Sequence, residues 1–151
     1  MGYGFGAAIG AAYGTSERSV LITGDGSFGM NLNELATAVA HGIPVVIVIM
    51  NNGVLGMVRQ WQTLFFGKRY SNTVLSDRRT DFVKLAEAFG AVGMRAESRE
   101  EFDAAFARAI ELDTVVVIDA LIDKDEFVLP MLPPGGSVEE IITTVDKEAI
   151  K

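Results

Sequence analysis

The stretch SVLITGDGSFGMNLNELATAVAHGIPVVIVIMNN, residues 19–52, decides the fold class of this chain. Its β-branched run Ser19–Thr23 is typical of a buried strand, and Gly24-Asp25-Gly26 ends that strand at a turn. Apolar residues at helical spacing predict a helix over Asn31–Ala40. Val45–Met50 is a continuous apolar run, as expected for a strand covered on both faces. The stretch therefore predicts a strand, a helix and a second, parallel strand.

The same alternation continues to the end of the chain. We expect helices over Met57–Phe66, Asp81–Phe89 and Ser98–Leu112, strands over Ala91–Arg95 and Thr114–Leu121, an extended segment over Leu129–Gly136, and a final helix from about Ser137. This order predicts an α/β fold of three layers, a parallel sheet with helices on both faces. A chain of 151 residues, 49% of them hydrophobic, is expected to form a single domain over residues 1–151.

Composition excludes several classes of function. The formal net charge of -7 argues against nucleic acid and anionic membrane surfaces, since both attract an excess of Lys and Arg. The longest apolar stretch, Ile43–Met50, is too short to span a bilayer. The Gly-rich N-terminus lacks the basic start of a signal peptide, and the absence of Cys is compatible with a reducing compartment. We therefore expect a soluble, cytoplasmic protein.

Two polar motifs follow the first two strands. Asp25 lies between Gly24 and Gly26, and Asn51-Asn52 follows the second strand, so both motifs are expected at one edge of a parallel sheet. Carboxylate and amide oxygens suit Mg²⁺, while the two glycines allow the backbone to approach an anion closely. Taken alone, Asp25 is better explained as a cap of the following helix and Asn51-Asn52 as a turn. Together they favour a site for a diphosphate with magnesium.

Longer stretches resemble one family. Gly-Asp-Gly followed by Asn-Asn, with Asp25 and Asn52 27 positions apart, is the signature of thiamine diphosphate enzymes. MGYGFGAAIGA, GMVRQWQTLFFGKRYSNT and PMLPPGGSVEEII are further similar to acetolactate synthase large subunits. The chain departs from that family's pattern at Gly26, where many relatives have Ala, and at Gly6, which replaces Pro. Neither change removes a ligand.

The resemblance implies specific roles. Asp25 and Asn52 would bind magnesium through their side chains and Val54 through its backbone carbonyl, while Gly26 and Ser27 would contact the diphosphate. Met1 and Met57 match positions near the cofactor, and Trp61 matches a position near the second substrate. For Met57 and Trp61, one helical turn apart, spacing alone favours core packing.

The resemblance also implies an activity and partners. The enzyme would condense two 2-keto acids, pyruvate with pyruvate or 2-ketobutyrate, with loss of carbon dioxide, in branched-chain amino acid biosynthesis. This chain would anchor thiamine diphosphate and magnesium and carry no catalytic residue, because the family's essential glutamate belongs to another domain of a three-domain enzyme. FAD, where present, would bind elsewhere. We expect a homodimer or tetramer with a possible small regulatory subunit, and an inactive isolated chain.

Other interpretations compete with this one. Residues 2–7 fit the dinucleotide pattern GxGxxA, but that pattern requires a strand directly before the glycines. A binding module without activity, or another thiamine diphosphate enzyme such as glyoxylate carboligase, pyruvate oxidase or a 2-keto acid decarboxylase, remains open. We interpret His41 as a helix-end residue, and Asp119 and Asp123–Asp125 as strand-end and loop carboxylates. Lys68-Arg69 and Arg78-Arg79 are interpreted as solvated loop charges, with contact to an acidic partner surface as the alternative.

Overall fold

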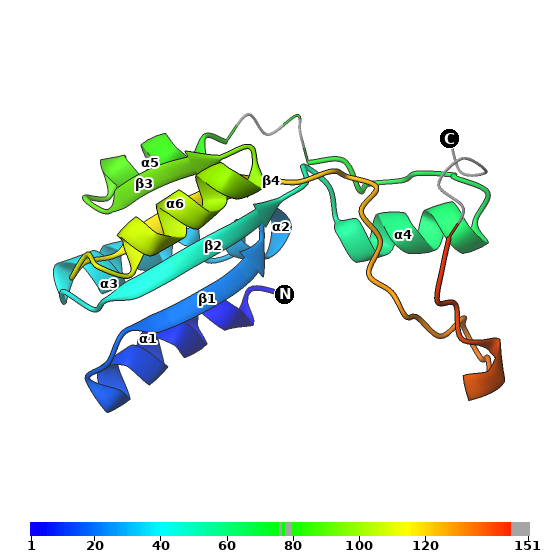
Figure 1. Ribbon diagram of the computed structural model, residues 1–151, viewed down its shortest axis with the longest axis horizontal. Coiled ribbons are helices and arrows are strands. Elements are labelled where there is room, and N and C mark those ends of the chain that lie inside the picture. Colours follow the sequence, from blue (N-terminus) through cyan, green and yellow to red (C-terminus); the bar gives the residue numbers. More distant parts are fainter. Residues whose placement is uncertain (76, 78–79, 146–151) are drawn as a thin grey trace.

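A parallel sheet forms the centre of the protein. The computed structural model describes residues 1–75, 77 and 80–145. Its strands are β1 (Ser19–Gly24), β2 (Val45–Asn51), β3 (Val92–Ala96) and β4 (Val116–Leu121). They lie in the order β1-β2-β4-β3 and all pair in parallel (Figure 1). The predicted strands and their direction are confirmed, with bounds that differ by one or two residues.

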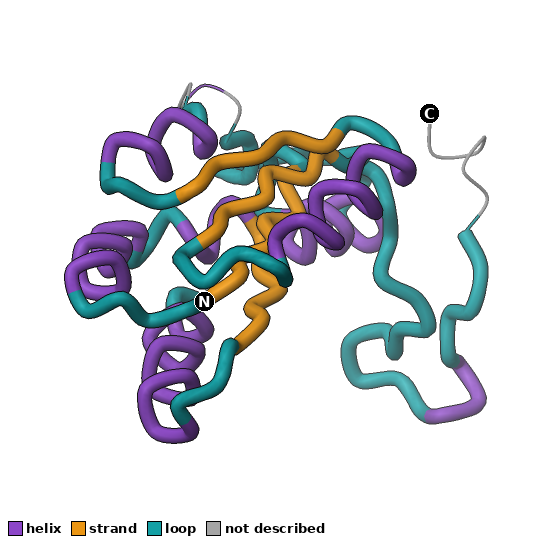
Figure 2. The backbone as a smooth tube through the Cα atoms, turned by 60° about the vertical axis from the view of Figure 1, so that its left-hand side comes forward, coloured by secondary structure: helices purple, strands orange, loops and turns teal. Residues whose placement is uncertain are grey.

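Helices cover both faces of the sheet. On one face lie α1 (Tyr3–Thr15), α3 (Leu35–Ala40) and α5 (Phe82–Ala88), whose apolar side chains pack with Val45, Ile47 and Val117 in one core cluster. On the other face α6 (Arg99–Ala109) packs over Val46, Val48, Val116 and Ile118 in a second cluster (Figures 1 and 2). The predicted three-layer α/β architecture is confirmed.

Three helical segments differ from the sequence-based expectation. The Gly-rich N-terminus forms the helix α1, which the glycine content concealed. Gly4 lets this helix pack closely on the sheet, since a Cβ at this position would lie 2.9 Å from Leu21 Cδ1 and that side chain would have to turn aside. The helix expected over residues 31–40 starts as a 3₁₀ turn, Leu32–Glu34, before α3. The helix expected from Ser137 is a single 3₁₀ turn, Val138–Glu140, because Ile142 already pairs with Met131 in an antiparallel bridge.

Helix α4 (Gly56–Phe65) and the segment that follows β4 stand beyond the carboxyl ends of the strands (Figure 1). Gln60 of α4 is 2% exposed and hydrogen-bonds to both backbone groups of Val128: its Nε2 donates to the carbonyl and its Oε1 accepts from the N–H. Within the described residues, no helix has the length and apolar character needed to cross a bilayer.

Candidate functional site

The two polar motifs meet where β1 and β2 end. Gly24 is the last residue of β1 and pairs in register with Met50, one residue before the end of β2. Asp25 opens the short helix α2 (Asp25–Phe28), and Asn52 directly follows β2. The parallel register thus brings both motifs to one edge of the sheet, as the sequence predicts.

One cavity of about 500 Å³ lies at this edge. Every residue that the sequence assigns to the cofactor or its metal lines it: Met1, Gly24, Asp25, Gly26, Ser27, Asn52, Val54 and Met57. Trp61 does not line this cavity.

The Gly-Asp-Gly turn is shaped for close approach. Gly24 has extended backbone and lines the cavity, and no heavy atom lies within 4 Å of where its Cβ would be. A Cβ at Gly26 would lie 2.7 Å from Leu55 Cδ2 and 3.0 Å from Leu75 Cδ1. These are the ends of flexible side chains, so the Ala of many relatives requires only that both leucines turn aside. Gly26 makes the turn compact without being indispensable.

Backbone near the N-terminus completes this side of the cavity. The N–H of Gly2 donates to Ser27 Oγ at 3.0 Å, and Asn31 Nδ2 donates to the Gly2 carbonyl at 2.7 Å. The two peptide groups that flank Gly2 are therefore both held by hydrogen bonds, next to Met1, which lines the cavity. Because Ser27 Oγ accepts from Gly2, its own proton is available to an acceptor in the cavity.

The Asn-Asn loop is a double turn. Asn51 Oδ1 accepts from the N–H of Gly53 at 3.3 Å, and Asn52 Oδ1 accepts from the N–H of Val54 at 3.1 Å. Gly53 has φ +66°, which favours glycine. Further along, Leu55 N–H donates to Thr73 O, which joins this loop to the segment after α4.

The donor set fits a magnesium diphosphate better than a metal bound by protein alone. Among the described residues, no group of three His, Cys, Asp or Glu side chains is placed to hold a metal ion. The cavity instead offers the carboxylate of Asp25, which is 7% exposed, the amide of Asn52 and the carbonyl of Val54. Mg²⁺ commonly takes few protein oxygens and completes its octahedron with phosphate oxygens and water.

Comparison with known proteins identifies the family. Residues 1–120 match the model of the "Thiamine pyrophosphate enzyme, C-terminal TPP binding domain". The chain belongs to this thiamine pyrophosphate enzyme family. The cofactor that its description names, thiamine diphosphate under its other name, is the one that the sequence motifs predict.

Named relatives of the thiamine pyrophosphate enzyme family narrow the resemblance. The chain is 41% identical to the acetolactate synthase large subunit of Haemophilus influenzae over 98% of its own length, and 49% identical to the acetolactate synthase of Mycobacterium bovis over 93%. It spans 26% and 24% of these relatives. A solved structure, the thiamine diphosphate-dependent 4-hydroxybenzoylformate decarboxylase of Rhodococcus jostii, superimposes with a TM-score of 0.76 at 31% identity over 84% of this chain and 24% of that one.

Sequence reasoning missed one wall of the cavity at the ends of β1 and β2. Ile122, Glu126, Phe127 and Val128, from the segment after β4, line the cavity together with Gln60. Their place after a strand's carboxyl end was the available signal. Arg59 binds this segment: its Nε lies 2.7 Å from Asp125 Oδ1, and this hydrogen bond raises the pKa of Arg59 above its ordinary value. The Arg59 guanidinium also lies 4.0 Å from the centre of the Tyr70 ring.

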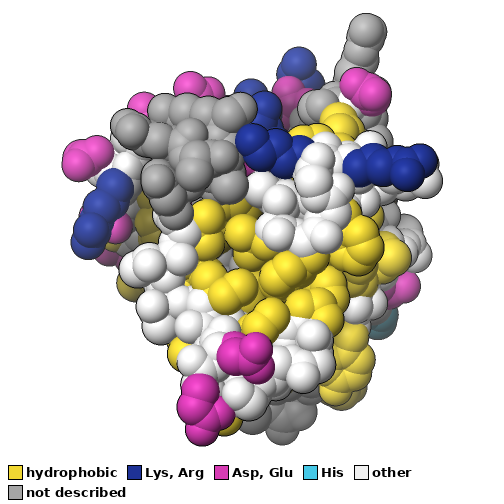
Figure 3. Space-filling model, turned by 90° about the vertical axis from the view of Figure 1, so that its right-hand side faces the viewer, with side chains coloured by type: hydrophobic (Ala, Val, Ile, Leu, Met, Phe, Trp, Pro, Cys, Tyr) yellow, Lys and Arg dark blue, Asp and Glu magenta, His cyan; other side chains and the backbone are white. Residues whose placement is uncertain are grey.

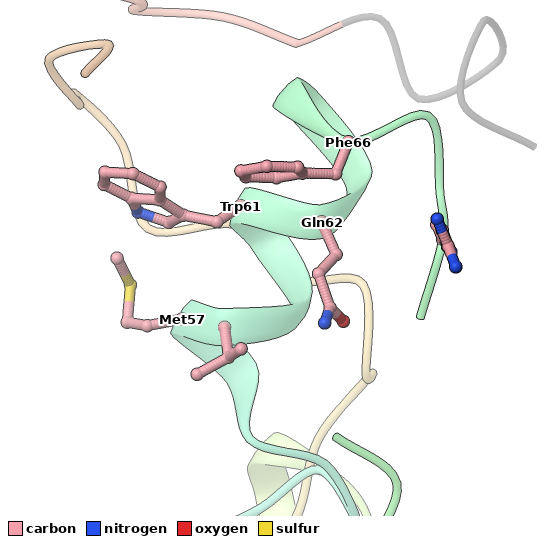
Figure 4. A pocket seen from close by; sticks show the side chains of 6 residues that line it. Met57, Trp61, Gln62 and Phe66 are labelled. Carbon is pink, nitrogen blue, oxygen red and sulfur yellow. The ribbon is translucent and has the colours of Figure 1, made fainter. Parts of the chain in front are cut away.

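Trp61 lies in a neighbouring pocket of about 510 Å³ on α4. Met57 and Val58 line both this pocket and the cavity at the ends of β1 and β2, so the two are adjacent. Met57 and Trp61 project from the same side of the helix, and hydrophobic side chains form a patch on this face of the molecule (Figures 3 and 4). Trp61 is 37% exposed and packs edge-on against Phe65, so it is not a buried core residue.

The remaining sequence interpretations have mixed outcomes. His41 is the C-cap of α3, as expected. Arg69 is exposed, as expected of a solvated charge, and it also lines the Trp61 pocket. Arg78 and Arg79 lie outside the described residues. The prediction that Asp119 is a strand-end carboxylate is wrong, because Asp119 lies inside β4 and is 1% exposed.

Proposed function

We propose that this chain is the cofactor-anchoring domain of an acetolactate synthase, which condenses two 2-keto acids with loss of carbon dioxide. The observation that carries the proposal is the single cavity at the ends of β1 and β2, lined by every residue that the resemblance assigns to the cofactor. The names of relatives more than 40% identical over nearly the whole chain support the same activity.

In this proposal the two loops bind different parts of the cofactor and its metal. Asp25, Asn52 and the Val54 carbonyl hold Mg²⁺, which neutralises the diphosphate. Gly24 and Gly26 allow backbone contact with the diphosphate, and Ser27 donates the proton that its bond to Gly2 leaves available. Met1 and Met57 contact the organic part of the cofactor. When bound, thiamine diphosphate supplies the carbon nucleophile of the reaction.

Trp61 would contact the second 2-keto acid. Its pocket adjoins the proposed cofactor cavity through Met57 and Val58, and this adjacency supports a role for its aromatic side chain in contact with substrate. Its partial exposure supports a role in contact with a ligand.

The chain would work as part of a longer enzyme, since it spans about a quarter of its relatives. The glutamate needed for proton transfer, and FAD if the enzyme uses it, would bind in other domains. Assembly as a homodimer or tetramer, a small regulatory subunit and a role in branched-chain amino acid synthesis follow from the same resemblance. The isolated chain is then expected to anchor the cofactor weakly and to form no acetolactate.

Calorimetric titration of the chain with thiamine diphosphate tests the anchoring role. We expect binding with Mg²⁺ and none with a chelator. Asp25→Ala should weaken it by about 2–4 kcal/mol, because a charged ligand is lost, whereas the surface variant Asp103→Ala should bind normally. Binding that Asp25→Ala leaves intact would refute the metal assignment. In the longer enzyme, incubation with pyruvate should yield acetolactate; release of acetaldehyde alone would indicate a decarboxylase instead.

A further inference from the structure

A charged side chain lies inside the sheet, away from the cavity lining. Asp119 of β4 is 1% exposed, and its neighbours in register are Ile49 of β2 and Arg95 of β3. A buried carboxylate costs free energy unless charge and hydrogen bonds compensate it. A well-packed apolar residue in such a place generally gives equal or better stability, so stability alone does not account for Asp119.

Asp119 makes two contacts that run in opposite directions along the sheet. Its Oδ2 lies 3.2 Å from Nη2 of Arg95, and the same Nη2 lies 3.1 Å from Oδ1 of Asp81, the N-cap of α5. Its Oδ1 accepts from Nδ2 of Asn51 at 2.8 Å. The polar chain Asp81–Arg95–Asp119–Asn51 therefore runs from the N-cap of α5, through β3 and β4, to the last residue of β2.

Asn51 is the residue through which this chain reaches the cavity. An ionised carboxylate only accepts hydrogen bonds, so Asp119 binds the NH₂ end of the Asn51 amide and directs its oxygen the other way. That oxygen accepts from the N–H of Gly53 and closes the first turn of the Asn-Asn loop. Asn52 lies inside this turn, and Val54 follows it.

We propose that Asp119 is a positioning residue for the magnesium diphosphate site and acts through the side-chain orientation of Asn51. This inference rests on the proposed cofactor-anchoring function. Arg95 neutralises Asp119, Asp119 fixes the amide of Asn51, and Asn51 fixes the turn that presents Asn52 and Val54. Metal ligands that are already held in position lose less entropy on binding. We therefore expect Asp119 to increase the affinity for the cofactor without contacting it.

A double-mutant cycle tests the proposal. Asp119→Asn and Asn51→Ala should each weaken Mg²⁺-dependent thiamine diphosphate binding by about 10- to 100-fold, as is usual for residues that orient metal ligands. The double variant should bind no more weakly than Asn51→Ala alone, because both changes remove the same effect. The control Asp103→Asn, on the outer surface of α6, should bind as the unchanged chain does. Losses of binding free energy that add up in the double variant would overturn the proposal. Unchanged binding in Asn51→Ala would also overturn it, even if Asp119→Asn failed to fold.

Hydrogen exchange without any ligand separates this inference from the proposed function. In Asp119→Asn the amide of Gly53 should exchange at least tenfold faster, while Ile22 in β1 should exchange at an unchanged rate. Faster exchange at Gly53 in a chain that binds no thiamine diphosphate would support the link from Asp119 to the loop and refute the cofactor role. Normal binding in the unchanged chain together with unaltered exchange at Gly53 would refute the link alone.

Discussion

Gly56→Ala is expected to displace a metal ligand without destabilising the fold. Gly56 is the first residue of α4, and its φ lies outside the left-handed region, so alanine is compatible with its backbone. The added Cβ would lie 2.8 Å from Nδ2 of Asn52. Since comfortable contacts begin near 3.4–3.5 Å, the Asn52 amide must move by about 0.6 Å.

This displacement exceeds what the metal tolerates. Mg²⁺ requires near-ideal geometry, with oxygen distances near 2.0–2.1 Å and a tolerance of about 0.2 Å. We therefore expect Gly56→Ala to weaken Mg²⁺-dependent thiamine diphosphate binding by about 10- to 100-fold, or about 1.4–2.8 kcal/mol. The free energy of unfolding should stay the same or rise by up to about 1 kcal/mol, because alanine favours helix.

The assay is calorimetric titration beside urea unfolding of the same samples. Gly10→Ala is the matched control, since it also adds a methyl group to a helix but has no heavy atom within 4 Å of the new Cβ. It should increase stability and leave binding unchanged. Normal binding in Gly56→Ala, while Asn52→Ala loses binding, would show that Asn52 does not bind the metal from the position seen here. Normal binding in both variants would remove Asn52 from the metal site.

Two further predictions concern the substrate side and the pH dependence of stability. Trp61→Leu in the longer enzyme should change the ratio of products from pyruvate and 2-ketobutyrate by about tenfold, because the two substrates differ by one methylene, and should change cofactor affinity little. The control is Tyr13→Leu, a variant on the exposed side of α1. Competition assays that give the same product ratio for both variants would show that Trp61 has only a packing role. The backbone N–H of Lys84, together with the charge of Arg95, lowers the pKa of Asp81 below 3.8, so its contribution to stability is complete above that pH and is lost as the pH falls through the lowered value. Asp81→Asn should therefore reduce the free energy of unfolding by a constant amount between pH 6 and 8. Urea unfolding should show that the difference from the unchanged chain becomes smaller below about pH 4. A difference that does not depend on pH would contradict the role of the Asp81 charge.

Local signals in the sequence were sufficient for the strands and for several helix ends. β2 is a continuous apolar run, and Ser98 and Asp81 accept hydrogen bonds from the first turns of α6 and α5, as their positions predict. The Ser98 capping box is only half formed, because the Glu101 carboxylate accepts from Glu97 N–H instead of Ser98. α1 was missed because glycine disfavours helix locally, while close packing on the sheet favours it.

The two motifs of the site were also predictable, since each directly follows a strand. The segment after β4 also follows a strand, but its contact with α4 was not predictable, because that contact depends on hydrogen bonds between Gln60 and Val128, 68 residues apart. The role of Asp119 was hidden for a similar reason: its partners Asn51 and Arg95 are distant in sequence, and only the strand order brings them together.

The two sides of the cavity are supported in different ways. The Asn-Asn loop is tied to the sheet itself, through Asn51 and Asp119, so its geometry depends on the most buried part of the protein. The side formed by α4 is tied instead to the segment after β4, through Gln60 to Val128 and Arg59 to Asp125. Changes on the sheet side should therefore alter affinity for magnesium and diphosphate. Changes on the exposed face of α4 should alter the choice of substrate and leave that affinity intact, so the two groups of variants should separate when both properties are measured on the same samples.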